Sequence, residues 1–203
     1  MGTNAGLFSS SLGKKYLMAI TGLFLCSFLI IHFLGNIALF TNPVQFNEYT
    51  RFMSSNPIIR VMEIILVLGF LTHIIDAIML TRANKKAQPV KYAMDKKQSS
   101  WYSRNMGLTG TIILVFLILH LQSFWYEYKF GEVLMTVDSN GDEIKDMFTI
   151  VKTAFSEWWY SAIYILAMIL LGSHLNHGFQ SAFQSVGLRH KKYTPTIKML
   201  GTG

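Results

Sequence analysis

Histidine is the residue of this sequence best suited to chemistry, because a neutral imidazole can bind a metal ion or pass on a proton. The chain has six histidines. Four of them lie in four long apolar runs, one in each: His32, His73, His120 and His174. His177 follows the last of these, and His190 lies in a basic tail. A single intramembrane histidine is explained by an interhelical hydrogen bond, but one in every run indicates a shared function.

The apolar runs predict helices that cross a membrane. Each has about the ~20 residues that a helix needs to span a bilayer, and a segment of that length must pair its own backbone groups as a helix. Only 14% of the chain is charged, whereas about 25% is typical of soluble domains. We therefore expect an all-α membrane protein, a transmembrane helical bundle in one domain. The domain covers 1–203, with helices at about 15–40, 58–82, 105–128 and 157–187.

The distribution of charge predicts the topology. The net charge is +7, with basic residues gathered at the N-terminus, in the loop 83–104 and in the C-terminal tail. The loop 129–156 is acidic. Positively charged loops face the cytoplasm, so the N-terminus is expected inside and the loops 41–57 and 129–156 outside. Basic residues placed at helix ends indicate a membrane surface and lipid as the partner, not nucleic acid. The Asn-Gly step in the outer loop predicts a hairpin turn.

The depths of the histidines divide them into two pairs. At about 1.5 Å per residue, His32 and His120 lie roughly 25 Å from the cytoplasmic edge, whereas His73 lies roughly 14 Å from it. His174 lies roughly 24 Å below the outer edge, in the same half as His73. Two facing imidazoles are what a six-coordinate haem iron requires, and such an iron carries electrons. The spacing predicts two haems stacked in the bundle core, although His174 and His177 both remain candidates on the fourth helix.

The segment that ends at His32 is repeated before His120. "TGLFLCSFLIIH" (21–32) and "TGTIILVFLILH" (109–120) each place a threonine 11 residues before the histidine. Eleven residues make about three helical turns, so the threonine and the histidine share a helix face. Thr21 and Thr109 are therefore expected near the inner haem. The glycine after each threonine would admit either a flat macrocycle or a closely packed helix.

Polar residues near the helix ends are further candidates. Haem propionates need cations or donors at the inner surface, and the candidates there are Lys14, Lys15, Ser103, Arg104 and Asn105. Arg104, just before the third helix, is preferred. Glu63 lies near the outer end of the second helix, where it could accept a proton beside a quinone or be a plain interfacial carboxylate. Asp76 is expected to reach water. His174 with His177 could also suggest a di-metal site, for which the core offers few carboxylates.

The four helical segments together resemble the cytochrome b membrane-anchor subunit of succinate:quinone oxidoreductases, in its single-chain, di-haem b558-type form. The similar stretches, in order, are "GKKYLMAITGLFL…IIHFLGN", "MEIILVLGFLTH", "SRNMGLTGTIILVFLILHL" and "GSHLNHGFQSAFQSVGL". The resemblance implies that His32, His73, His120 and His174 are the axial ligands, which leaves His177 among the haem surroundings. The family has five helices, and this chain reaches "YTPTIKMLGTG" where the fifth is expected to begin.

The resemblance also implies partners and a reaction. A flavoprotein subunit and an iron–sulfur subunit are expected on the cytoplasmic side, where they oxidise succinate or reduce fumarate. Electrons would pass through two haem b groups to or from a membrane quinone, menaquinone in this type. The chain would be a non-flavin subunit of the enzyme and a multi-pass protein of the bacterial inner (cytoplasmic) membrane. The residues implied at an outer quinone pocket are Gln45, Asn47, Glu48 and Glu63.

Two other classes of function remain open. A di-haem cytochrome b of another quinone-linked enzyme, such as a hydrogenase or formate dehydrogenase anchor, often places two ligand histidines on one helix. A membrane protein without haem could use its histidines to relay protons. The sequence carries no dinucleotide-binding glycine motif, Walker loop or nucleophile elbow, so chemistry on a soluble substrate is expected on a partner subunit.

Overall fold

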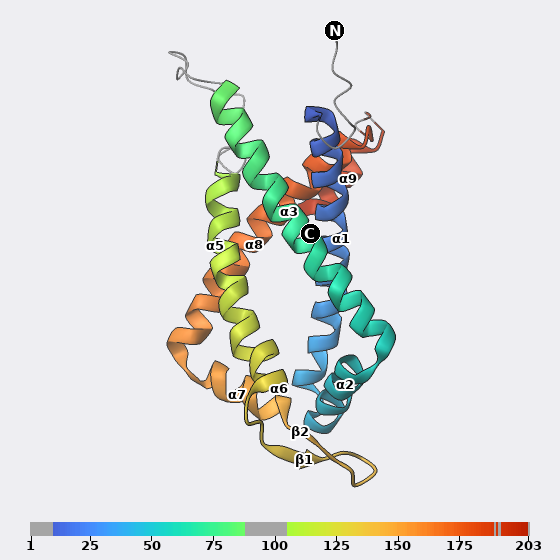
Figure 1. Cartoon of the computed structure of the whole chain (residues 1–203), viewed down its shortest axis with the longest axis vertical. Helices are drawn as coiled ribbons and strands as arrows, with labels where there is room; N and C mark the ends of the chain where they lie inside the picture. The colour runs from blue at the N-terminus through green and yellow to red at the C-terminus, as the bar shows by residue number, and fades with distance from the viewer. Residues whose placement is uncertain (1–9, 88–104, 189, 191, 203) are drawn as a thin grey trace. The chain divides into compact units, whose positions relative to one another are not determined.

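Four long helices dominate the computed structural model, which describes residues 10–87, 105–188, 190 and 192–202 (Figure 1). All four are long and apolar enough to cross a membrane. They confirm the predicted all-α membrane fold and its number of visible spans. Contacts group the chain into two compact units, each built from parts of all four long helices, and each unit is described by itself.

The observed helix bounds lie close to the predicted ranges. The first span is α1 (Ser11–Asn36), which continues into a 3-10 turn, η1 (Ile37–Phe40). The second is α3 (Pro57–Ala87); Pro57 stands at its first position, and the Asn56 side chain accepts a hydrogen bond from the Ile58 amide at 2.9 Å. The third span is α5 (Met106–His120), a π-helical segment η2 (Leu121–Tyr126) and α6 (Glu127–Phe130), and the fourth is α8 (Trp158–Ser185).

The apolar side chains of these helices point outward. Phe33 is 68% exposed, Ile58 72% and Ile165 63%. At most 17% of the most apolar window in any of the four helices is buried inside the protein. Side chains that contact acyl chains need no burial in protein, because the lipid itself keeps them from water. The chain is therefore a multi-pass membrane protein.

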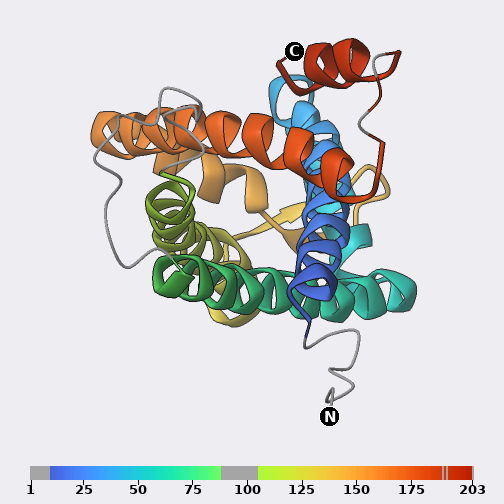
Figure 2. The same ribbon diagram turned by 90° about the horizontal axis from the view of Figure 1, so that it is seen from above.

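The first unit consists of Met1–Ser27, Leu66–Gly110 and Leu171–Gly203. In its described residues, α1 and α3 pack closely at Gly69, where an added Cβ would lie 2.9 Å from a ring carbon of Phe24. A short helix, α9 (Thr194–Thr202), turns back along the end of α8 (Figure 2). At Gly201 an added Cβ would lie 3.3 Å from the Phe179 ring, so α9 packs directly on α8.

The second unit consists of Phe28–Ile65 and Thr111–Leu170. It holds two helices that the sequence pattern did not predict, α2 (Pro43–Ser55) and α7 (Met147–Ser156), inside the two segments expected to be outer loops. The Asn42 side chain caps α2, and the Asp146 side chain caps α7. These caps turn the polar loops into short helices whose apolar faces meet. Buried residues of α2, η2 and α7 form the core of the unit: Phe46, Phe124 and Met147.

A two-stranded hairpin completes the second unit. Strand β1 (Met135–Val137) pairs antiparallel with β2 (Glu143–Lys145), and Thr136 lies opposite Ile144. The connecting loop contains Gly141 with a φ of 88°, a conformation that glycine adopts without steric cost. The predicted Asn-Gly hairpin turn is therefore confirmed. The hairpin packs against α2 (Figure 1).

Polar contacts join α2 to the hairpin and to α7. Asn47 donates to Asp146 at 2.9 Å and accepts from the Phe148 amide at 2.8 Å. Arg51 pairs with Asp138 at 2.9 Å, and the Glu48 carboxylate accepts the Ser139 amide at 2.8 Å. The segments 41–57 and 129–156 thus form one folded module, as expected of loops on the same side of a membrane. We call α2, the hairpin and α7 the loop module.

The loop module should lose stability in acid. Partial burial alone would raise the pKa of Asp146, but hydrogen bonds from Thr149 and Asn47 outweigh burial and hold the pKa below its usual 3.8. The hydrogen bond from the Asp142 amide is the main cause that lowers the pKa of Asp138. A carboxyl whose pKa is depressed by folding stabilises the fold above its unfolded pKa, and this stability is lost as the pH falls through the folded pKa.

We therefore expect the amides of the loop module to have high protection factors against hydrogen exchange at neutral pH, and these factors to fall below about pH 4. The Asp146→Asn variant should lower the protection factors at neutral pH and flatten their dependence on pH. Protection factors in Asp146→Asn that still fall in acid as steeply as in the wild type would show that this carboxylate does not set the dependence.

Candidate functional site

The second unit brings His32 and His120 together. The His32 ring, on α1, and the His120 ring, at the end of α5, have centroids 5.7 Å apart and planes at 85°. These are the two histidines that the depth estimate assigned to the outer pair. His32 also stacks on Phe28 at 5.4 Å, and its side chain is largely exposed. Two helices far apart in the sequence thus present one imidazole each to the same place.

The first unit holds His73 on α3 and His174 on α8, the predicted inner pair. Both side chains are partly buried. His177 lies one turn further along α8. The grouping of four histidines into two pairs therefore follows the two compact units.

The Thr21 hydroxyl contacts Nδ1 of the His73 ring. The Thr21 hydroxyl oxygen lies 3.1 Å from Nδ1 of His73 and 2.8 Å from the carbonyl oxygen of Leu17. The hydroxyl has a single hydrogen, and when it is donated to the backbone carbonyl the oxygen accepts from Nδ1–H of His73. The proton of His73 is then on Nδ1. Nε2 keeps its lone pair and is the nitrogen available to a metal.

Thr109 and His174 repeat this arrangement. The Thr109 hydroxyl lies 3.5 Å from Nδ1 of His174 and 3.2 Å from the carbonyl oxygens of Asn105 and Met106. The next residue, Gly110, would place an added Cβ 3.6 Å from Cε1 of His174, just as Gly22 would place one 3.5 Å from Cε1 of His73. The Thr-Gly step of each sequence repeat thus receives an imidazole from another helix. Each of these glycines thus faces the edge of an imidazole, and which of their two predicted roles applies stays a prediction.

His120 has a tyrosine partner that sequence reasoning missed. Its Nδ1 lies 3.0 Å from the hydroxyl of Tyr164, which lies 3.1 Å from the hydroxyl of Tyr160. Phe116 and Phe124 pack against the His120 ring. The available signal was the spacing of four between the two tyrosines on one helix. This spacing does not indicate a histidine partner by itself, because tyrosine near the end of a spanning helix is usually an interfacial anchor.

The histidine pairs fit a haem in ligand number and chemistry. Among the residues that the structure describes, no group of three or more histidine, cysteine or carboxylate side chains is placed to hold a metal ion. A haem iron needs only two ligands from protein, because the porphyrin supplies the other four. Metal-ligating histidines donate their second N–H to an oxygen, and Thr21 and Thr109 provide such an oxygen. The donor set of the inner pair is therefore of the kind that a six-coordinate haem uses.

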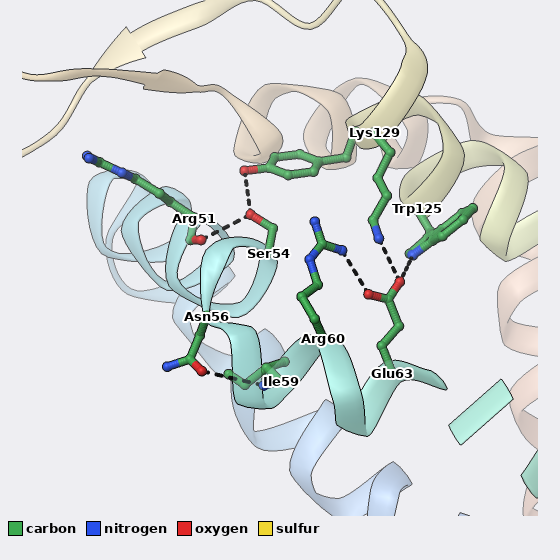
Figure 3. Close-up of polar contacts among 9 residues, drawn as sticks. Arg51, Ser54, Asn56, Ile59, Arg60, Glu63, Trp125 and Lys129 are labelled. Atoms are coloured by element: carbon green, nitrogen blue, oxygen red, sulfur yellow. Dashed lines mark hydrogen bonds and ion pairs between the residues drawn. The ribbon is translucent and has the colours of Figure 1, made fainter. Parts of the chain in front are cut away.

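A second polar cluster surrounds Glu63 (Figure 3). The Glu63 carboxylate lies 2.8 Å from Arg60 and 2.7 Å from Lys129, and it accepts the Trp125 indole N–H. The Lys129 ammonium also lies 4.6 Å from the centre of the Trp125 ring. Trp125 belongs to the π-helical segment η2, which follows His120 directly. Such π segments are frequent at functional sites.

The cluster joins one carboxylate to two cations beside a small hollow. The hollow measures about 290 Å³ and is lined by Leu121, Gln122, Trp125 and Tyr126, all from the η2 segment. The Glu63 side chain is 27% exposed and that of Lys129 19%. Charged side chains that are partly shielded from water, next to an apolar hollow, could orient the polar head of a ligand whose body is apolar.

The remaining predicted site residues lie elsewhere. Asn47 and Glu48 are both engaged within the loop module, and Gln45 is exposed on α2. Lys15 is exposed on α1, and Ser103 and Arg104 lie outside the described residues. The expectation that Asp76 reaches water is wrong, because its side chain faces the packed interior of the first unit and the residue is 4% exposed.

No protein-family model, curated protein or solved structure matches this chain. Any assignment of function therefore rests on the pattern of its four apolar segments and on the geometry of the two histidine pairs.

Proposed function

We propose that this chain is the di-haem cytochrome b anchor of a succinate dehydrogenase or fumarate reductase complex. It would pass electrons between the iron–sulfur subunit and a membrane quinone, menaquinone in this form. The chemistry of succinate and fumarate would take place on the flavoprotein subunit. The proposal continues the resemblance of the four helical segments and draws its structural support from the histidines.

The observation that carries the proposal is the arrangement of four histidines as two pairs. His32 and His120 contact each other in the second unit, and His73 and His174 each meet a threonine hydroxyl in the first. Haem, when bound, supplies transfer of single electrons at an iron that has no open coordination position. The residues of this chain would hold the group, fix the orientation of the imidazoles and keep water away from the ring faces.

The Glu63 cluster is the part of the structure best suited to a quinone. Lys129, whose ammonium has hydrogens beyond the one given to Glu63, could orient an oxygen of a quinone head, and Glu63 could exchange a proton with it. Gln45, Asn47 and Glu48 remain weaker candidates, because the last two already hold the loop module together. In this proposal the loop module faces outward and the N-terminus faces the cytoplasm of a bacterial cell, as the basic ends suggest.

The activity of the isolated complex tests this proposal. A tagged form of the chain, purified from its native membrane in mild detergent, is expected to bring with it a flavoprotein and an iron–sulfur protein. The complex should reduce a soluble menaquinone analogue in the presence of succinate, or oxidise the reduced analogue with fumarate. Co-purification of hydrogenase or formate dehydrogenase subunits in their place would assign the chain to another quinone-linked enzyme.

A further inference from the structure

The two threonines of the sequence repeat make the same unusual contact. Each hydroxyl oxygen lies within hydrogen-bond distance of a backbone carbonyl of its own helix and of Nδ1 of a histidine on a different helix. Thr21 is 9% exposed and Thr109 3% exposed, so water does not compete for either hydroxyl. A polar group buried in this way is costly unless it is paired, and the histidine provides the pairing.

We infer that Thr21 and Thr109 are positioning residues for the inner haem, a role that rests on the proposed function. Each hydroxyl oxygen accepts a hydrogen bond from Nδ1–H. This holds the imidazole in the tautomer that leaves Nε2 free for iron. The hydrogen bond that Nδ1–H donates to the hydroxyl also makes the imidazole a more basic ligand. A more basic ligand favours the ferric over the ferrous state of the iron. The repeated Thr-Gly step therefore places one hydroxyl oxygen beside each inner ligand.

The glycine of each step lies beside the same ring. Gly22 and Gly110 face Cε1 of His73 and His174 at ordinary contact distance from where a Cβ would lie. A methyl group at either glycine would therefore meet Cε1 without strain, and the contact that holds each ring is the hydroxyl at Nδ1. Thr21 should act more strongly than Thr109, because its oxygen is 3.1 Å from Nδ1, against 3.5 Å for Thr109.

Redox titration of the haem spectrum in the purified complex tests the inference. Thr21→Val keeps the shape of the side chain and removes the acceptor. One haem should then titrate at a more positive midpoint potential and be lost about 10- to 100-fold more readily, since outer-shell partners affect metal affinity by that factor. Thr21→Ser should restore the wild-type potential. Thr109→Val should shift the same haem by a smaller amount.

The matched control is Thr72→Val. Thr72 precedes His73 on α3 and donates to the Leu68 carbonyl at 2.7 Å, so the substitution removes the same kind of backbone hydrogen bond on a more exposed face. Both haems should titrate in this variant as in the wild type. If Thr21→Val does not accumulate, Thr109→Val carries the same test.

Two results would overturn the inference. Unchanged potentials and haem retention in Thr21→Val and Thr109→Val would show that the hydroxyls do not act on the ligands. A Thr21→Ser variant that behaves like Thr21→Val would show that packing of the methyl group matters instead. If the wild-type complex carries two haems and the threonine variants titrate normally, only this inference is overturned. If the wild-type complex carries no haem, the proposed function is overturned as well.

Discussion

The alanine variants of His32 and His120 are expected to lose the same haem and to keep the other. The rings of these two histidines contact each other in one compact unit, and a six-coordinate iron needs both. In each variant the ratio of haem to protein should fall by half, and the same step should vanish from a redox titration. His73→Ala and His174→Ala should remove the remaining step instead.

His177→Ala and His190→Ala are the matched controls for the histidine variants. His177 is partly buried on the same helix as His174, and His190 accepts a hydrogen bond from the Lys192 amide in the tail. Both variants should retain two haems. Loss of one identical redox step in His32→Ala and in His73→Ala would mean that the pairing of the four histidines is wrong.

The Glu63→Gln variant is expected to have the second large effect, on quinone turnover. Glutamine keeps the size of the side chain and can still accept the Trp125 indole N–H, but Arg60 and Lys129 lose their counter-charge. If Glu63 exchanges protons with quinone, turnover should fall by about 100-fold, the lower end of what a positioned acid or base contributes. Reduction of a soluble dye by succinate and the content of both haems should not change.

Glu132→Gln is the control for Glu63→Gln, because it removes the same charge from an exposed position in the segment 129–156. It should turn over quinone at the wild-type rate. Glu63→Gln could instead turn over quinone at the wild-type rate and lose only about 1 kcal/mol of stability. That result would show that the Glu63 carboxylate is a surface ion-pair partner only.

The sequence was a sufficient guide to those parts of the structure that depend on hydrophobicity. Four spanning helices arise from apolar runs, and the hairpin arises from an Asn-Gly step at which Gly141 adopts a positive φ. The helices α2 and α7 were not predicted, because their sequences are short and the fold of each depends on a cap and on the other. Asn42 and Asp146 supply the caps, and their role becomes visible only once the two loops are packed together.

The grouping of the four histidines could be predicted from the sequence, but the side chains that they contact could not. One histidine per apolar run and the Thr-to-His spacing of 11 residues could be read from the chain. Which nitrogen of His73 faces Thr21, and that His120 meets Tyr164, depends on how separate helices are rotated against each other. The position of Trp125 next to Glu63 depends on the π-helical segment, which shifts the residues after His120 around the helix axis.

The haem content of the purified wild-type complex is the decisive measurement for the role of the four histidines. A pyridine haemochrome assay against protein concentration counts haem groups and identifies their type without reference to activity. Two histidine pairs in two compact units predict two b-type haems for each copy of the chain. A complex that is folded, membrane-bound and free of haem would refute the assignment of these histidines as axial ligands.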